Sequence, residues 1–307
     1  MIHQHVDRYV QLHRALGKKF DAQEKALRQF AIFVAKRTAV SITAGLILDW
    51  IREAPTPNAT RVRFNLARAF AEFLHGEDPR HEAPAVGLMG RGRRRRPAPY
   101  ILLPDQIARI MAEALNMPGQ ASISPLTYHH LIGLLASTGL RISEALSLRS
   151  DDLARDGLMV RSGKFGKSRL VPLHSSTRSA LEQYLAVRRK VRNASDDLFV
   201  LGHGRAPTAA RVHVVFVRVV RRLGYRNSTG PGPRLHDLRH TFAVRSLEAC
   251  GNDPHAVLRH MRALSTYLGH VDVANTYWYL EATPVLLRMI ASATEGAFVG
   301  GAACGFR

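Results

Sequence analysis

The sequence predicts a mostly helical protein with one small β-hairpin, an α+β fold arranged in two domains. Three observations lead to this prediction. Apolar residues recur at helical spacing along most of the chain. One stretch, residues 158–173, alternates apolar and polar side chains around glycines. A basic run, GRGRRRRPAP, separates the two parts, and 307 residues suffice for two hydrophobic cores.

Residues 1–88 predict a small bundle of four helices. Asp21 followed by Glu24 indicates a capping box at the start of the second helix. Thr43 precedes the third helix, and Gly76 is the expected C-cap of the fourth. The apolar residues that are expected to give these helices a buried face are Val6, Val10, Leu12, Leu27, Phe30, Ala31, Val34, Ile47, Trp50, Leu66, Phe70, Phe73 and Leu74.

A basic linker is predicted at residues 89–99. Its arginines are flanked by Gly and Pro, and such a run is too charged to enter a core or to form a stable helix. Bound to a nucleic acid it would contact several phosphates, with an affinity that falls as salt rises. A nuclear-import tract and a solubilising spacer are the alternative interpretations. The arginines are Arg91, Arg93, Arg94, Arg95 and Arg96.

Residues 100–292 make up the second predicted domain, followed by a tail at residues 293–307 that is expected to be disordered. Pro104 lies in the first turn of a helix. An apolar helix is expected over residues 125–138, with Gly139 ending it.

Further along, the hairpin at residues 158–173 precedes a helix that follows Ser175. The LFVL segment at residues 198–201 is interpreted as a short strand. Residues 211–223 fit a helix with a Val-rich buried side, although such a run is also compatible with a strand.

The charge of the chain points to a polyanionic partner. The formal net charge is +20 and the pI is about 11.0, which fits DNA, RNA or an anionic membrane surface. No run of eighteen or more apolar residues is present, so a transmembrane helix is not expected. The polar N-terminus does not resemble a signal peptide, and the two cysteines, Cys250 and Cys304, suggest neither a disulfide framework nor a zinc site. A cytoplasmic protein associated with the nucleoid is the expectation.

Four motifs supply residues suited to attack on a phosphate without a metal or other cofactor. TGLRISEAL contains Arg141, SGKFGKSRLVPL contains Lys164, LHDLRHTFA contains His236 and Arg239, and LGHVDVANTYWYL contains His270 and Tyr279. In this order the motifs resemble the tyrosine recombinase (phage integrase) family over residues 100–283. The resemblance implies a helical core-binding domain at residues 1–88 that clasps DNA opposite a catalytic domain. It also implies a site-specific recombinase that cleaves and rejoins DNA through a 3′-phosphotyrosyl link.

The residue types fit that chemistry. A free tyrosine has a pKa of roughly 10, so it needs a neighbouring base and a cationic field to attack at neutral pH. Arg141 and Arg239 are candidates for the clamp on the non-bridging oxygens, because a guanidinium is always charged and offers a planar fork of donors. The leaving 5′-oxygen needs a proton, which arginine cannot supply. Glu144 is placed to orient Arg141.

Lysine is rare in this chain, which makes its position in the hairpin informative. Only 7 of the 44 Lys and Arg residues are lysine, and Lys164 and Lys167 are the only two between Lys36 and Lys190. A solvated surface charge is the alternative interpretation for a lysine in a Gly-rich turn. Lys164 matches the hairpin lysine of the family and is the expected general acid. Lys167 and Arg169 are expected to contact phosphates.

His236 and Arg239 are three residues apart, so on a helix they share a face and can address one phosphate. His240 is adjacent to Arg239 and is expected to be structural, and Asp237 to cap or pair locally.

The family's spacing places the nucleophile nine residues after the histidine of LGH, which selects Tyr279 over Tyr277. Tyr267 precedes that histidine and is expected to pack. His270 is implied to hydrogen-bond the phosphate.

The expected partners are a double-stranded recombination site and further copies of the chain, as a tetramer on DNA, with or without sister recombinases. The stretch around LSTYLGHV and TYWYLEATP also resembles transposon-encoded recombinases, including those that occur as three adjacent genes. An apolar face after residue 282 could pack in cis or dock on a neighbouring subunit. Two alternatives remain: a type IB topoisomerase that relaxes DNA, and a non-catalytic DNA-binding accessory protein of the same fold.

Overall fold

The chain forms two compact units, Met1–Arg96 and Pro97–Arg307. The computed structural model describes residues 2–90, 99–118, 122–161, 168–227, 232–250 and 254–269. The linker arginines and the expected tail lie outside these residues. So do four of the expected site residues, namely Lys164, Lys167, His270 and Tyr279.

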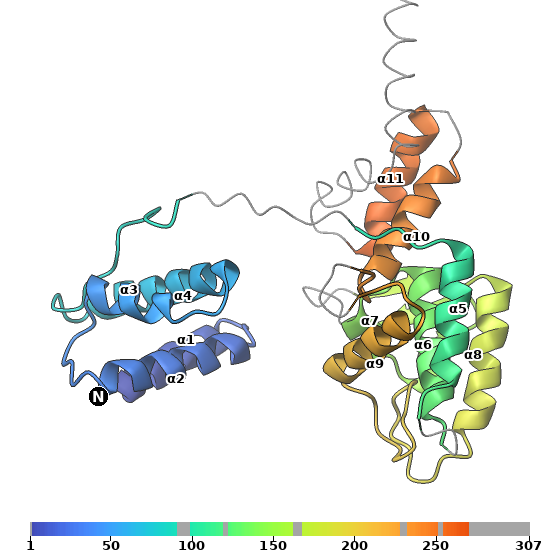
Figure 1. Cartoon of the computed structure of the whole chain (residues 1–307), viewed down its shortest axis with the longest axis horizontal. Coiled ribbons are helices and arrows are strands. Elements are labelled where there is room, and N and C mark those ends of the chain that lie inside the picture. Colours follow the sequence, from blue (N-terminus) through green and yellow to red (C-terminus); the bar gives the residue numbers. More distant parts are fainter. Residues whose placement is uncertain are drawn as a thin grey trace, which may run out of the picture. The chain divides into compact units, whose positions relative to one another are not determined.

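The N-terminal unit is the expected bundle of four helices, α1 (Ile2–Ala15), α2 (Asp21–Ala35), α3 (Ala44–Arg52) and α4 (Pro57–His75). In Figure 1, α1 lies beside α2 and α3 beside α4, and the helices enclose one apolar core. Phe30, Trp50 and Phe70 contribute large side chains to that core, each at most 2% exposed. Twelve of the thirteen predicted apolar positions belong to it as fully buried or partly buried members, and Phe33 and Phe64 join them. Leu12 is the exception, at 45% exposed.

The sequence predicted the N-cap of α3 correctly and that of α2 incorrectly. Thr43 caps α3 as expected, its Oγ1 accepting a hydrogen bond from the Leu46 backbone N–H at 3.2 Å. The predicted capping box at Asp21 is wrong, because the N-cap of α2 is Phe20 in a left-handed conformation and no side chain caps the helix. Asp21 and Glu24 instead accept hydrogen bonds from Arg14 at the end of α1, at 3.1 and 2.6 Å.

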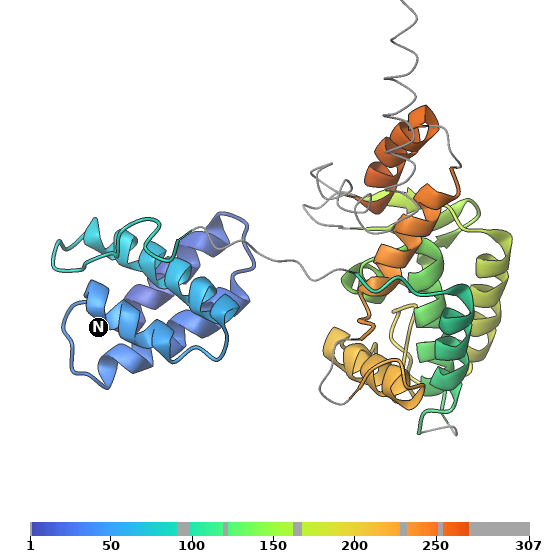
Figure 2. The same ribbon diagram turned by 45° about the horizontal axis from the view of Figure 1, so that its top comes forward.

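The C-terminal unit is built on a helical layer. Helix α6 (Ser124–Thr138) packs against both α5 (Pro104–Leu115) and α8 (Ser175–Arg188), and α9 (Ala209–Arg222) packs against α5. Helix α10 (Asp237–Glu248) packs on α6, and α11 (Pro254–Leu268) packs on α10, as the tilted view of Figure 2 also shows. The short helix α7 (Ile142–Leu146) follows α6 directly.

The predicted hairpin is present as the strands β2 (Gly157–Val160) and β3 (Arg169–Val171), paired antiparallel with Val160 opposite Arg169. A short strand that the sequence did not predict, β1 (Leu153–Ala154), adds to β2 and gives the order β1-β2-β3. The β1–β2 turn requires glycine at residue 157, because a Cβ there would lie 2.3 Å from the Val171 carbonyl oxygen.

Two predictions about this unit are settled by packing. Residues 198–201 are not a strand: Leu198, Phe199 and Val200 are buried in the core, and the Val200 N–H donates to the Tyr184 hydroxyl at 3.1 Å. Side chains thus satisfy backbone groups that a sheet would otherwise pair. The Val-rich segment near residue 215 is helical, with Val212, Val215, Phe216, Val219 and Val220 on its buried face.

Candidate active site

Arg141 is presented by a sharp turn between α6 and α7. Gly139 ends α6 with φ +61°, a conformation that costs residues with a side chain roughly 1–2 kcal/mol. A Cβ on Gly139 would also lie 2.6 Å from the Phe242 ring. Three residues after Arg141, Glu144 accepts hydrogen bonds from the Arg141 backbone N–H at 3.0 Å and from its Nη1 at 2.7 Å. The expected contact between Glu144 and Arg141 is therefore present.

Arg239 lies on α10 and is 2% exposed. Its Nη1 donates to the Gly139 carbonyl at 2.6 Å, and its Nη2 donates to the Leu268 carbonyl at 2.7 Å. Arg141 approaches the same end of α11, with Nη1 3.3 Å from the Leu268 oxygen and Nη2 3.3 Å from the Gly269 oxygen. Both guanidinium groups therefore meet the carbonyl end of α11, where the helix dipole favours cations.

His236 stands at the N-cap position of α10, beside the two arginines. The residue is exposed overall, and it lines a cavity of about 280 Å³ together with Arg239, Arg234 and His213. Partial burial, together with the positive charges of Arg239, Arg234 and Arg141, lowers the pKa of His236, while Asp237 opposes the shift. An imidazole below its usual pKa is neutral at pH 7 and offers one N–H donor.

The neighbours of His236 fix the start of α10. Asp237 is fully buried and accepts hydrogen bonds from the backbone N–H of Arg234 at 2.7 Å and from its guanidinium at 2.7 and 3.1 Å, which confirms the expected local pairing. His240 packs edge-on against His236 with ring centroids 4.6 Å apart. Burial, followed by the nearby His236, lowers the pKa of His240 to about 3, in keeping with the predicted structural role.

Arg169 has a different environment from the phosphate contact that the sequence suggested. It lies on β3 with 17% of its side chain exposed, and its guanidinium faces protein groups. Its Nη2 is 2.9 Å from Glu144, and its Nε donates to the Tyr267 carbonyl at 2.8 Å. Lys167, the other expected phosphate contact of the hairpin, lies outside the described residues.

Tyr267 packs, as expected. Its ring stacks on Phe242 with centroids 5.5 Å apart. Burial raises its pKa to about 12, against the opposing charges of Arg169 and Arg239. A phenol this hard to ionise is poorly suited to attack a phosphate at neutral pH.

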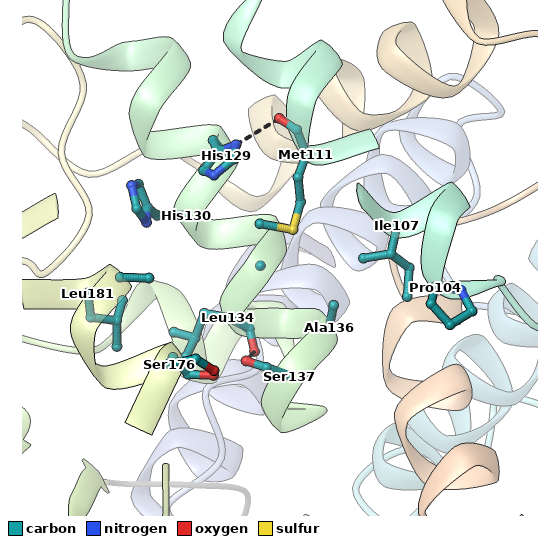
Figure 3. Close-up of a pocket in the computed structure, with 13 residues that line it drawn as sticks. Pro104, Ile107, Met111, His129, His130, Leu134, Ala136, Ser137, Ser176 and Leu181 are labelled. Carbon is teal, nitrogen blue, oxygen red and sulfur yellow. Dashed lines mark hydrogen bonds between the residues drawn. The ribbon is translucent and has the colours of Figure 1, made fainter. Parts of the chain in front are cut away.

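A second cavity in this unit, of about 410 Å³, is chemically unlike the arginine site. It lies between α5, α6 and α8 and is shown in Figure 3. Its described lining contains no arginine or lysine, and His129 uses Nδ1–H to donate to the Met111 carbonyl at 2.9 Å. Burial, with the nearby His129, lowers the pKa of His130 to about 4. This apolar cavity without a cation does not suit a phosphate.

The structure therefore brings together Arg141, His236 and Arg239, three of the six expected catalytic residues. Lys164, His270 and Tyr279 lie outside the described residues, as do Arg91, Arg93, Arg94, Arg95 and Arg96. The backbone carbonyls of Gly139, Leu268 and Gly269, which hold the arginines, were not found from the sequence. The glycines of TGLR and LGH are the only sequence signal of such close approaches.

Residues 101–284 match the phage integrase family, which is more than half of the chain. The y4rB protein of Sinorhizobium fredii, which carries the name integrase/recombinase, is 38% identical over 298 residues, covering 93% of this chain and 94% of its own.

The chain belongs to the phage integrase family. It is a tyrosine-type site-specific recombinase that cleaves and rejoins DNA. This result favours the recombinase over the type IB topoisomerase that the motifs also allowed.

Solved structures of the family share the fold. A lambda integrase dimer bound to a core site is 17% identical with a TM-score of 0.63, covering 92% of this chain and 96% of that one. The Tn1549 transposon integrase in complex with transposon right-end DNA is 16% identical with a TM-score of 0.64, covering 95% and 98%. Within the described part of this recombinase, no helix is both long and apolar enough to cross a bilayer.

Proposed function

We propose that Arg141, His236 and Arg239 form the phosphate-binding part of the recombinase active site, completed by Lys164, His270 and Tyr279. The observation that carries this proposal is the meeting of the two guanidinium groups at the end of α11, with Leu268 as shared acceptor. His270 and Tyr279 follow that helix end in the sequence, so the element that ends at the arginines also leads to the expected nucleophile.

The proposed reaction exchanges one phosphodiester for another. The Tyr279 hydroxyl releases its proton to solvent water and attacks the phosphorus, forming a bond to the 3′-phosphate while the bond to the 5′-oxygen breaks. Arg141 and Arg239 stabilise the charge on the non-bridging oxygens, and neutral His236 donates one hydrogen bond there. Lys164 gives its proton to the departing 5′-oxygen. A 5′-hydroxyl from the partner strand then reverses these steps. Because protein side chains supply every group in this scheme, the proposed reaction needs no metal or other cofactor.

We propose further that the chain acts as a homotetramer on a double-stranded recombination site, with or without sister recombinases. The lambda integrase neighbour is a dimer on its core site, which supports assembly on DNA. The net charge of +20 supports broad phosphate contact, to which the five linker arginines contribute. The Tn1549 neighbour supports a place in a mobile element, with the group of three adjacent recombinase genes as the candidate subtype. A cytoplasmic, nucleoid-associated location follows from a DNA substrate.

A nicked duplex tests this function directly. The bound sequence is first selected from random duplexes with the purified chain, and the selected site is then synthesised with a nick at successive positions. Cleavage just upstream of a nick releases a short 5′-hydroxyl fragment, which diffuses away and leaves the protein joined to DNA. We expect one nick position to give a covalent adduct on a denaturing gel. Tight binding without an adduct at any position would instead identify a non-catalytic accessory protein.

A further inference from the structure

Arg169 links three segments of the catalytic unit through one guanidinium group. It projects from β3, one of the two strands that flank Lys164 in the sequence. Its Nη1 and Nη2 contact the two carboxylate oxygens of Glu144 at 3.3 and 2.9 Å, and its Nε donates to the Tyr267 carbonyl at 2.8 Å. Every nitrogen of the group therefore faces protein, on a side chain that is 17% exposed.

Glu144 is shared between Arg169 and Arg141. The carboxylate is 5% exposed. Burial by itself would raise its pKa, but hydrogen bonds and charge from Arg169 and Arg141 bring the pKa down to about 2, so the group is ionised at neutral pH. Oε1 lies 2.7 Å from Arg141 Nη1, while Oε2 accepts from Arg169 and from the Arg141 backbone. Arg169 thus binds both oxygens of the Glu144 carboxylate, which Arg141 could otherwise bind through two of its own guanidinium nitrogens.

Gly269 shows how closely the Arg169 guanidinium lies against the end of α11. The glycine has φ +65°, and a Cβ at this position would be 3.1 Å from Arg169 Nη1 and 3.4 Å from its Cζ. The glycine of the LGH motif is therefore required both by the backbone conformation and by the arginine beside it. His270 is the next residue in the sequence.

We propose that Arg169 is a positioning residue of the recombinase and not a DNA contact. By holding Glu144 and the Tyr267 carbonyl together, it fixes β3, the Arg141 guanidinium and the end of α11 in one arrangement. Without it, Glu144 is free to bind Arg141 at both oxygens and draws that guanidinium away from a phosphate. Lysine replaces this function only in part, because an ammonium group lacks the planar fork that spans a carboxylate and a carbonyl. The inference rests on the proposed function of Arg141.

The test compares Arg169→Gln and Arg169→Lys with Arg161→Gln as matched control. Arg161 also lies next to the sheet, but within the described part of the chain its partners are Asp152, 2.6 Å from its Nε, and Asp151, 4.0 Å from its Nη2, and neither Glu144 nor α11. For each protein we would measure DNA affinity at several salt concentrations, the single-turnover rate of adduct formation at saturating nicked duplex, and thermal unfolding.

We expect Arg169→Gln to bind DNA with the parent's salt dependence and to form adduct about 100-fold more slowly. The rate of adduct formation by Arg169→Lys should lie between those of Arg169→Gln and the parent protein. Arg161→Gln should form adduct at the parent's rate. Combined with Glu144→Gln, the Arg169→Gln change should slow the reaction less than the product of the two single effects, because both act on Arg141.

Two results would overturn the proposal. One is a weaker DNA affinity of Arg169→Gln together with an unchanged rate of adduct formation at saturating DNA. If the slope of log affinity against log salt concentration also falls by about one, Arg169 is a phosphate contact. The other is independent, multiplicative effects of the Glu144 and Arg169 changes. If Arg169→Gln does not fold, Arg169→Lys and Gly269→Ala decide: slow chemistry with normal binding supports the proposal, and parent-like rates refute it. A parent protein that forms no adduct would refute the proposed function itself.

Discussion

Arg141 and Arg239 donate to the same atom, the carbonyl oxygen of Leu268, at 3.3 and 2.7 Å. Arg141 comes from the turn after α6 and Arg239 from the first turn of α10, so the last residue of α11 joins two distant parts of the chain. The contact explains why the motifs around these arginines and the LGH motif occur together, since each arginine depends on the helix end that precedes His270.

The first prediction concerns the nucleophile. Tyr279→Phe removes the hydroxyl that is expected to attack, so DNA binding should be normal while the covalent adduct disappears. Tyr277→Phe is the matched control and should keep the adduct. Peptide mass mapping of the trapped complex reads out the site, and a link at Tyr277 would reverse the assignment.

Cleavage is expected in EDTA and without ATP. The proposed site uses guanidinium, imidazole and ammonium groups, and the phosphotyrosyl bond conserves the energy of the broken linkage. Adduct formation on the nicked duplex with EDTA, compared with the same reaction in Mg²⁺, measures this. A strict need for Mg²⁺ in the cleavage step would point to carboxylate-bound metal chemistry instead.

Lys164→Ala should slow cleavage of normal DNA severely, because the leaving 5′-oxygen then lacks its acid. Sulfur in place of that bridging oxygen leaves with little need for a proton, so the same variant should recover most of its rate on the sulfur substrate. Arg141→Ala acts on the non-bridging oxygens and should not recover. Equal rescue of both variants, or of neither, would remove Lys164 from the acid role and make Lys167 the next candidate.

The stability of the catalytic unit should fall in mild acid partly through His240. Burial and the nearby His236 hold the His240 pKa at about 3 in the folded protein, while an unfolded histidine binds its proton near pH 6.5. Between these values the unfolded state binds more protons, so the free energy of unfolding decreases as pH falls.

His240→Gln cannot titrate, so it should lessen that decrease by up to about 1.4 kcal/mol per pH unit between pH 6 and 3. Urea unfolding at a series of pH values measures the effect. The contribution of the N-terminal unit to the pH dependence cancels, because that unit is identical in the variant and the parent. The pKa of His130 is about 4, so His130→Gln should show a similar effect, which ends near pH 4 instead of pH 3. Parallel curves for His240→Gln and the parent would contradict the prediction.

Local rules determined much of this protein from the sequence alone. Apolar spacing predicted the four N-terminal helices and α9, while Pro104 and Gly139 predicted where α5 begins and α6 ends, because periodicity and helix ends depend on neighbouring residues. The order of Arg141, His236 and Arg239 within their motifs likewise indicated phosphate chemistry before any geometry was known.

Tertiary structure decided what those residues contact. Residues 198–201 have the composition of a strand but serve as irregular core, because the Tyr184 hydroxyl and the Arg188 guanidinium satisfy their backbone. Arg169, which looked like a DNA contact, binds Glu144 and the Tyr267 carbonyl. Every residue carries a backbone carbonyl, so no sequence pattern distinguishes the one at Leu268 that receives two arginines. Only the packing of α11 on α10 brings that oxygen to the site.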